Sequence, residues 1–169
     1  MKTQLRVAGI INESIVDGPG IRLVVFAQGC KHKCPGCHNP ETHSFTGGTL
    51  VSMGSIIENM SKNPILDGIT LSGGEPFEQA EGFAELAHKA KIMGLNVITY
   101  TGYTYEELLK GSKKNMAWRK LLNETDTLVE GRFELDKKNF LLKFRGSENQ
   151  RIIDLKTSRL NNEVVLAGS

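Results

Sequence analysis

The chain has 169 residues, of which 39% are hydrophobic and 24% charged, and 21 basic against 19 acidic side chains give a formal net charge of +2. This length and composition predict one globular domain over residues 1–169, exclude a disordered or fibrous chain, and, without a basic stripe, predict no nucleic-acid partner. No apolar run approaches the roughly 18 residues of a membrane span, and the N-terminus lacks a signal-peptide core, so we expect a cytoplasmic protein with no membrane partner.

Short apolar segments then alternate with segments of helical character in the first half of the chain. Residues 21–27 are β-branched and apolar, which predicts a buried strand. A helix is expected over 52–62, with Ser52 as its N-cap, and a second strand over 68–71. This order predicts a strand–helix–strand unit.

The same alternation continues in the middle of the chain. Residues 77–93 carry apolar side chains at helical spacing, and Gly94 follows them where a helix would end. Further strands are expected over 96–100 and 127–129. The chain therefore repeats its strand–helix unit.

Two weaker signals complete the pattern. Thr104 with Glu107 three residues later is a capping-box pattern that starts another helix. Residues 152–155 and 164–167 are expected to form a hairpin or edge strands.

Strands that alternate with helices pair in parallel through right-handed crossovers, which brings their C-terminal ends to one edge of the sheet. We therefore predict an α/β fold of parallel (β/α) repeats with ligand loops at the C-terminal ends of the strands. This topology places Cys30, Gly73, Thr101 and Glu130 near one another. Because a full barrel needs about 250 residues, we expect an open, partial TIM-like barrel.

All three cysteines of the chain, Cys30, Cys34 and Cys37, fall in one short segment. Thiolates suit iron, and short spacers let one loop wrap a compact cluster. Three ligands on a four-iron cluster leave one iron open to a substrate, whereas a closed zinc site takes a fourth Cys or a His. Zinc completed by His32 or His38, or a cysteine cluster of redox or structural role, stays open as an alternative. Both histidines are expected to be surface or supporting groups rather than ligands.

A second motif, Ser72 to Glu75, follows the strand expected over 68–71. Gly73 and Gly74 lack β-carbons and would let a ligand lie against the backbone, and the Glu75 carboxylate can accept hydrogen bonds from an ammonium. A plain strand-to-helix turn would explain the same residues.

Cys-x3-Cys-x2-Cys followed by Gly-Gly-Glu resembles the radical S-adenosylmethionine superfamily. Within it, the chain resembles the activators of glycyl-radical enzymes, and most of all the family that activates anaerobic ribonucleotide reductase. The likeness lies in residues 16–22, 29–30, 37–40, 100–103, 128–133 and 144–151.

The resemblance implies an anaerobic oxidoreductase with a 4Fe-4S cluster on Cys30, Cys34 and Cys37. S-adenosyl-L-methionine would be cleaved reductively at the open iron, and the resulting radical would leave a glycyl radical on a partner protein. The implied partners are the large subunit of an anaerobic ribonucleotide reductase and a low-potential electron donor such as flavodoxin. Activation of pyruvate formate-lyase or another glycyl-radical enzyme is the nearest alternative, followed by a small-molecule radical enzyme and a non-catalytic metal-binding module.

The resemblance also implies roles for individual residues. The expected contacts with S-adenosylmethionine are Gly36, Ser72, Gly73, Gly74, Glu75 and Thr101. Gly36 replaces an aromatic residue common in the wider superfamily, so its contact would use the backbone. Asp17, in the turn-rich segment 17–20, is expected to guide the partner's glycine segment, although a tight connection explains that segment too. Glu130 stands where the activator pattern has Asp, and residues 145–151 carry no chemistry that their sequence reveals.

Overall fold

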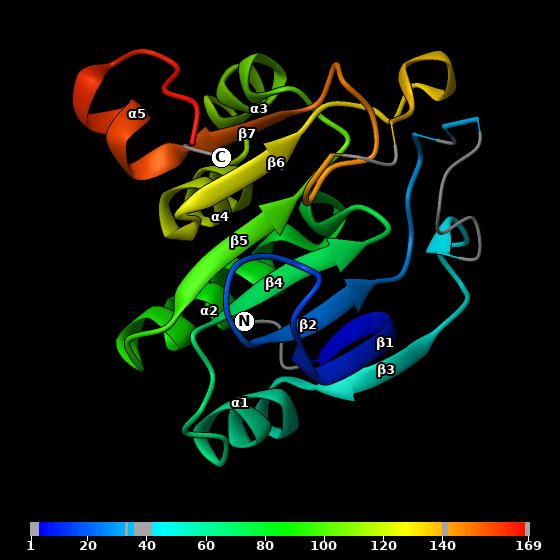
Figure 1. Cartoon of the computed structure of the whole chain (residues 1–169). Helices are drawn as coiled ribbons and strands as arrows, with labels where there is room; N and C mark the ends of the chain where they lie inside the picture. Colours follow the sequence, from blue (N-terminus) through cyan, green and yellow to red (C-terminus); the bar gives the residue numbers. More distant parts are fainter. Residues whose placement is uncertain (1–3, 33, 36–41, 140–141, 168–169) are drawn as a thin grey trace.

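The computed structural model describes residues 4–32, 34–35, 42–139 and 142–167 (Figure 1). Gly36, Cys37 and His38 lie outside the described residues, so their predicted roles stay predictions. Among the described residues, no helix combines the length and apolar character needed to cross a bilayer.

One mixed sheet forms the centre of the structure, in the order β3-β1-β2-β4-β5-β6-β7. Its strands are β1 (Gln4–Ser14), β2 (Arg22–Ala27), β3 (Thr49–Ser52), β4 (Gly68–Gly73), β5 (Asn96–Tyr100), β6 (Thr127–Glu130) and β7 (Arg151–Asp154). The helices are α1 (Met53–Ser61), α2 (Ala80–Ile92), α3 (Tyr105–Ser112), α4 (Met116–Glu124) and α5 (Leu155–Asn161), with short 3-10 turns η2 (Pro76–Gln79) and η3 (Leu135–Lys137).

The middle of the sheet is parallel and its flanks are antiparallel. Strands β2, β4, β5 and β6 pair in parallel, whereas β1, β3 and β7 pair antiparallel with their neighbours. The predicted α/β fold with a parallel centre is therefore confirmed. The described strands form an open sheet, and its curvature into a partial barrel stays a prediction.

Helices cover one face of the sheet, and a long loop crosses the other (Figure 1). Because successive side chains of a strand point to opposite faces, Leu23 and Val25 of β2 join the helix-packed core while Arg22 and Phe26 face the other way. The loop between β1 and β2 lies across this second face, which we call the front face. The front face is thus the one on which a ligand site can open.

The four predicted strands over 21–27, 68–71, 96–100 and 127–129 correspond to β2, β4, β5 and β6. The helix predicted over 52–62 is also confirmed, and Ser52 caps it by accepting from the Ser55 amide at 3.1 Å. The helix predicted over 77–93 is confirmed only from Ala80 onward. Its first residues form η2, because Pro76 and the side chain of Glu75, which accepts from the Phe77 amide, set a tighter turn.

The C-terminal prediction is wrong in part. Residues 151–154 form the edge strand β7, but α5 follows it directly, so the two segments make no hairpin. Residues 165–167 lie antiparallel to β7 through an isolated bridge between Leu166 and Ile153 and two backbone hydrogen bonds, without forming a strand. Strands β1 and β3 and helices α4 and α5 were not predicted. In β1 only Leu5, Val7 and Ser14 are buried. The alternation of buried and exposed residues is therefore too short to predict a strand from the sequence.

The predicted capping box of α3 is present. Thr104 Oγ1 accepts from the Glu107 amide at 3.1 Å, and the Glu107 carboxylate accepts from the Thr104 amide at 2.9 Å. Arg132 adds two hydrogen bonds to the same carboxylate, at 2.9 and 3.2 Å. Together, first through Arg132 and then through Thr104, these contacts lower the pKa of Glu107 from 4.5 to about 2.

We expect Glu107→Gln to flatten the acid limb of the stability curve. A carboxyl whose folded pKa is depressed stabilises the fold above its unfolded pKa of 4.5, and this contribution is lost as the pH falls toward 2. Since the side chain is 43% exposed, solvent screening limits the effect to about 1 kcal/mol. Urea unfolding between pH 2 and 7 measures it, with Glu58→Gln on the exposed side of α1 as the control. Parallel curves for wild type and Glu107→Gln would contradict the assignment.

Candidate active site

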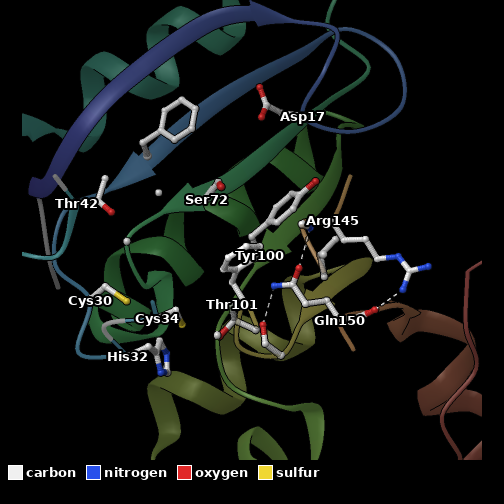
Figure 2. A pocket seen from close by; sticks show the side chains of 18 of the residues that line it. Asp17, Cys30, His32, Cys34, Thr42, Ser72, Tyr100, Thr101, Arg145 and Gln150 are labelled. Carbon is white, nitrogen blue, oxygen red and sulfur yellow. Dashed lines mark hydrogen bonds between the residues drawn. The ribbon is translucent and has the colours of Figure 1, made fainter. Parts of the chain in front are cut away.

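A pocket of about 470 Å³ opens at the C-terminal ends of the parallel strands (Figure 2). Its volume lies within the ~300–1,000 Å³ typical of small-molecule sites. The front face of the sheet supplies Phe26, Ser72, Tyr100 and Val129, one from each of β2, β4, β5 and β6. Alternation along four strands therefore builds one surface of the pocket.

Loops that follow the same strands form the walls. Cys30, Gly73 and Thr101 all line the pocket, which confirms that the loops after β2, β4 and β5 converge. Val129 within β6 lines the pocket, and Gly131 and Phe133 line it after that strand. Figure 2 shows Cys30 and Cys34 grouped with His32 at one end of the pocket and Asp17 at the other.

The cysteine loop lies against the segment that returns from it. The Gly29 amide donates to the Thr42 carbonyl at 2.7 Å, and the Cys30 amide to the His43 carbonyl at 3.1 Å. Cys30 and Cys34 both line the pocket. Within the described residues no set of three or more His, Cys, Asp or Glu side chains could hold a metal ion, and Cys37 lies outside them. Two thiols on one wall of a ligand-sized pocket fit the cluster that Cys30, Cys34 and Cys37 are expected to hold.

The Glu75 carboxylate is fully buried behind the pocket wall and accepts four hydrogen bonds. Oε1 accepts from His32 Nε2 at 2.7 Å and from the Gly102 amide at 2.8 Å. Oε2 accepts from Thr101 Oγ1 at 2.8 Å and from the Phe77 amide at 3.1 Å. Each oxygen is thus already paired twice, so in this arrangement Glu75 joins loops to one another, and its predicted contact with an ammonium would require a rearrangement.

Gly73 and Gly74 are required by packing between backbones. A β-carbon on Gly74 would lie 2.5 Å from the Gly29 carbonyl oxygen and 2.9 Å from that of Thr42. Gly73 has a φ of +89°, and its β-carbon would lie 2.5 Å from the Ala27 amide nitrogen. Both glycines also line the pocket, and the close approach of a ligand to their backbone stays a prediction.

Asp17 reaches the pocket because the loop before β2 is tied to the front face. Its backbone carbonyl accepts from Thr70 Oγ1 at 2.8 Å, and its carboxylate accepts from Ser14 Oγ at 2.5 Å. Thr70 in turn accepts from Arg22 Nε at 2.8 Å, and Arg22 Nη1 donates to the Pro19 carbonyl at 3.0 Å. These contacts fix the position of Asp17 at the pocket, and its role toward a partner stays a prediction.

Arg22 is the largest fully buried side chain of the chain's described part, with 2% exposure. Its guanidinium makes five hydrogen bonds, all to neutral oxygens: one to Thr70, one to Pro19, one to Ile69 and two to Asn96. Burial lowers the pKa of Arg22 to about 10. The side chain stays a cation at neutral pH and links β2, β4, β5 and the Asp17 loop.

Tyr100 lies between the two ends of the pocket (Figure 2). Its pKa is raised, first by burial and then by the negative charge of Asp17. The phenol is therefore neutral, and it presents a ring and a hydroxyl to a ligand.

The segment 145–151, whose role the sequence left open, is a loop at the pocket that is held by hydrogen bonds between its own residues. Gln150 Oε1 accepts from the amides of Gly146 and Ser147 at 2.8 and 3.1 Å, and its Nε2 donates to the Gly131 carbonyl at 2.9 Å. Arg145 Nη1 donates to the Gln150 carbonyl at 2.6 Å (Figure 2). Gln150 thus fixes this loop to the end of β6.

The Glu130 side chain turns away from the pocket. It is 1% exposed and accepts from Arg151 at 3.0 and 2.9 Å and from the Tyr105 amide at 2.6 Å. These contacts, together with Glu106, raise the pKa of Arg151. Glu130 therefore joins β6, β7 and α3, while its neighbours Val129 and Gly131 line the pocket.

Several pocket residues were not predicted. Tyr100 could have been found, because it ends the strand predicted over 96–100 and lies on the same face as Ile98. His32, expected as a surface or supporting group, has a side chain only 4% exposed. Thr42 and His43 follow the cysteines and carry no sequence signal that would place them in the wall.

Comparison with known proteins agrees with this site. Residues 16–153 match the family described as "4Fe-4S single cluster domain". The chain is 34% identical over 146 residues to the anaerobic ribonucleoside-triphosphate reductase-activating protein of Enterobacteria phage T4, covering 81% of this chain and 86% of that protein. It is 34% identical over 150 residues to the protein of that name from Escherichia coli (strain K12), covering 84% and 94%. The pyruvate formate-lyase-activating enzyme of Clostridium pasteurianum is 38% identical over 114 residues, covering 62% of this chain and 48% of that enzyme.

We expect Gly74→Ala to lower the free energy of unfolding by about 1–3 kcal/mol, because the added carbon overlaps two backbone carbonyls that cannot move independently. Gly54→Ala is the matched control, since nothing lies within 4 Å of a β-carbon there. Urea unfolding of both variants without cofactors measures the difference. Equal stability of Gly74→Ala and wild type would show that Gly74 is needed for the ligand alone.

Proposed function

Because the chain belongs to the 4Fe-4S single cluster family and, within it, to the activating proteins of anaerobic ribonucleoside-triphosphate reductase, we propose that it generates a glycyl radical on such a reductase. The observation that carries this proposal is the single pocket that brings Cys30 and Cys34 to one end and Asp17 to the other (Figure 2). A cofactor site and a site for the partner's glycine would thus share one cavity.

We propose that Cys30, Cys34 and Cys37 hold a 4Fe-4S cluster and that S-adenosylmethionine binds beside it. When bound, the two groups supply a reductive cleavage that ends in hydrogen abstraction from a glycine of the reductase. Two pocket-lining thiols within one short loop fit such a cluster.

The chain's own residues would bind and orient S-adenosylmethionine. Ser72, Gly73, Gly74 and Thr101 line the pocket next to the cysteines and are the proposed contacts for S-adenosylmethionine, with Gly36 as a further one. In this proposal Glu75 acts indirectly, by holding the loops that carry these contacts.

Apolar and aromatic groups would keep water from the reacting atoms. The aromatic side chains that line the pocket are Phe26, Tyr100, Phe133 and Phe144. A reactive radical needs a site from which solvent is excluded, because side reactions compete with transfer. Asp17, fixed through Thr70, would place the partner's glycine segment at the far end.

We propose one domain over residues 1–169, with the open sheet curved as a partial barrel, in an anaerobic cytoplasm. The partner would be the large subunit of the reductase, and a low-potential donor such as flavodoxin would supply the electron. Activation of pyruvate formate-lyase is the second candidate, since an activating enzyme of that kind matches 62% of this chain.

The test is anaerobic incubation of the reduced, cluster-loaded protein with S-adenosylmethionine and the large subunit of an anaerobic ribonucleotide reductase. We expect a glycyl radical by electron paramagnetic resonance and one 5′-deoxyadenosine for each radical formed. Cys30→Ala, Cys34→Ala and Cys37→Ala should each lack stable cluster or cleavage, because three thiolates are the minimum for an open iron. A colourless, zinc-bound protein, or full cleavage by any one of these variants, would refute the proposal.

Asp17→Ala separates partner recognition from cofactor chemistry. We expect near-normal uncoupled cleavage of S-adenosylmethionine but at least a tenfold loss of glycyl radical, because transfer is sensitive to displacements of about 1 Å. Radical yield and 5′-deoxyadenosine are measured in the same sample. Equal loss of both would assign Asp17 to the cofactor site or the fold, and loss of neither would make segment 17–20 a connecting loop only.

A further inference from the structure

A buried histidine lies inside the cysteine loop. His32 is placed between Cys30 and Cys34, yet its side chain is only 4% exposed. Its Nε2 lies 2.7 Å from Oε1 of Glu75, whose side chain is fully buried. Oε1 of Glu75 already accepts from the Gly102 amide, so we assign the hydrogen of this bond to Nε2.

Through Glu75, the histidine is connected to two further loops of the pocket. The same carboxylate accepts from the Gly102 amide and the Thr101 hydroxyl, both at 2.8 Å, and both residues follow β5. Glu75 itself follows β4. One carboxylate therefore joins the loops after β2, β4 and β5, and His32 is its contact in the first of them.

The imidazole occupies a space shaped for a ring. It contacts the Tyr103 ring edge-on, with centroids 4.5 Å apart and planes at 78°. A β-carbon on Gly102 would lie 2.5 Å from His32 Cδ2, so only glycine lets the imidazole approach the backbone at this point. Ring packing and hydrogen bond thus fix the same side chain from two directions.

The neighbouring lysine cannot replace this contact. Lys31 Nζ lies 3.5 Å from Glu78, but its side chain is 61% exposed, and exposed ion pairs hold a loop weakly. Hydrogen bonds to a buried charged group are stronger, and losing one partner leaves an unsatisfied buried group behind.

We propose that His32 is a positioning residue: its bond to Glu75 holds the cysteine loop in the arrangement that binds the cluster before the cluster enters. The inference rests on the proposed function, since it concerns the cluster assigned there. Three thiolates on a mobile loop must be ordered when the metal binds, whereas a loop ordered in advance avoids that loss of entropy. His32 then acts through Glu75 and the loop backbone, without ligating iron.

His32→Asn and His32→Gln test this. The terminal amide of Gln places a donor near the position of Nε2, whereas Asn is too short to reach Glu75. Amide hydrogen exchange of the full chain without cluster is compared first. In His32→Asn we expect residues 29–35 and 101–103 to exchange about tenfold faster, with β2, β4 and β5 unchanged, because one hydrogen bond to a charged group is lost.

The same variants are then reconstituted anaerobically with iron and sulfide. We expect slower cluster incorporation in His32→Asn, and recovery of both exchange and incorporation in His32→Gln. His88→Asn is the matched control, because His88 pairs with Glu124 at 3.1 Å on the surface, with 57% of its side chain exposed. Neither measurement should change in that control.

Three results would overturn the proposal. They are unchanged exchange of residues 29–35 in His32→Asn, equal defects in the Gln and Asn variants, and faster exchange throughout the sheet, which would make His32 a general determinant of the fold. Exchange in the protein without cluster needs neither S-adenosylmethionine nor reductase. A failure of the glycyl-radical assay with wild-type protein would therefore refute the proposed function without changing the result of the hydrogen-exchange test of His32.

Discussion

The organisation of the pocket depends on one buried carboxylate. Placing an ionised group in the protein interior is costly unless hydrogen bonds replace its water, and Glu75 receives four of them. Its donors come from three different loops, so the charge is satisfied only when those loops are in place together. The requirement for four donors thus makes the loops after β2, β4 and β5 a single cooperative unit.

A second buried charge organises the opposite end of the pocket. Arg22 has no carboxylate partner within hydrogen-bond distance among the described residues, and neutral oxygens of Thr70, Pro19, Ile69 and Asn96 surround its guanidinium. The loop that carries Asp17 must lie on the front face to complete this set. Hydrogen bonds to one buried polar side chain, Glu75 or Arg22, therefore position the loops at each end of the pocket.

Much of the fold was predictable from local pattern. Segments 21–27, 68–71, 96–100 and 127–129 are apolar enough to form strands in any compact structure, and the alternation with helices made their parallel pairing predictable. Parallel pairing alone then brings Cys30, Gly73 and Thr101 to one edge. Strand β1 was missed because few of its side chains are buried, and helix α4 because it packs mainly on α2, a contact that periodicity does not report.

By itself, the sequence determined which residue types stand at the ends of the strands: three closely spaced cysteines, a Gly-Gly-Glu turn and the segment 17–20. Only the tertiary structure decided where their side chains point. Glu75 looked like a ligand contact, but its buried carboxylate already accepts four hydrogen bonds from the protein. For His32 the sequence left open a surface or a supporting position, and the structure places it against Tyr103 and Glu75, both over 40 residues away in sequence. Such partners are fixed by three-dimensional packing, because a buried charge must be paired wherever the chain brings donors close enough.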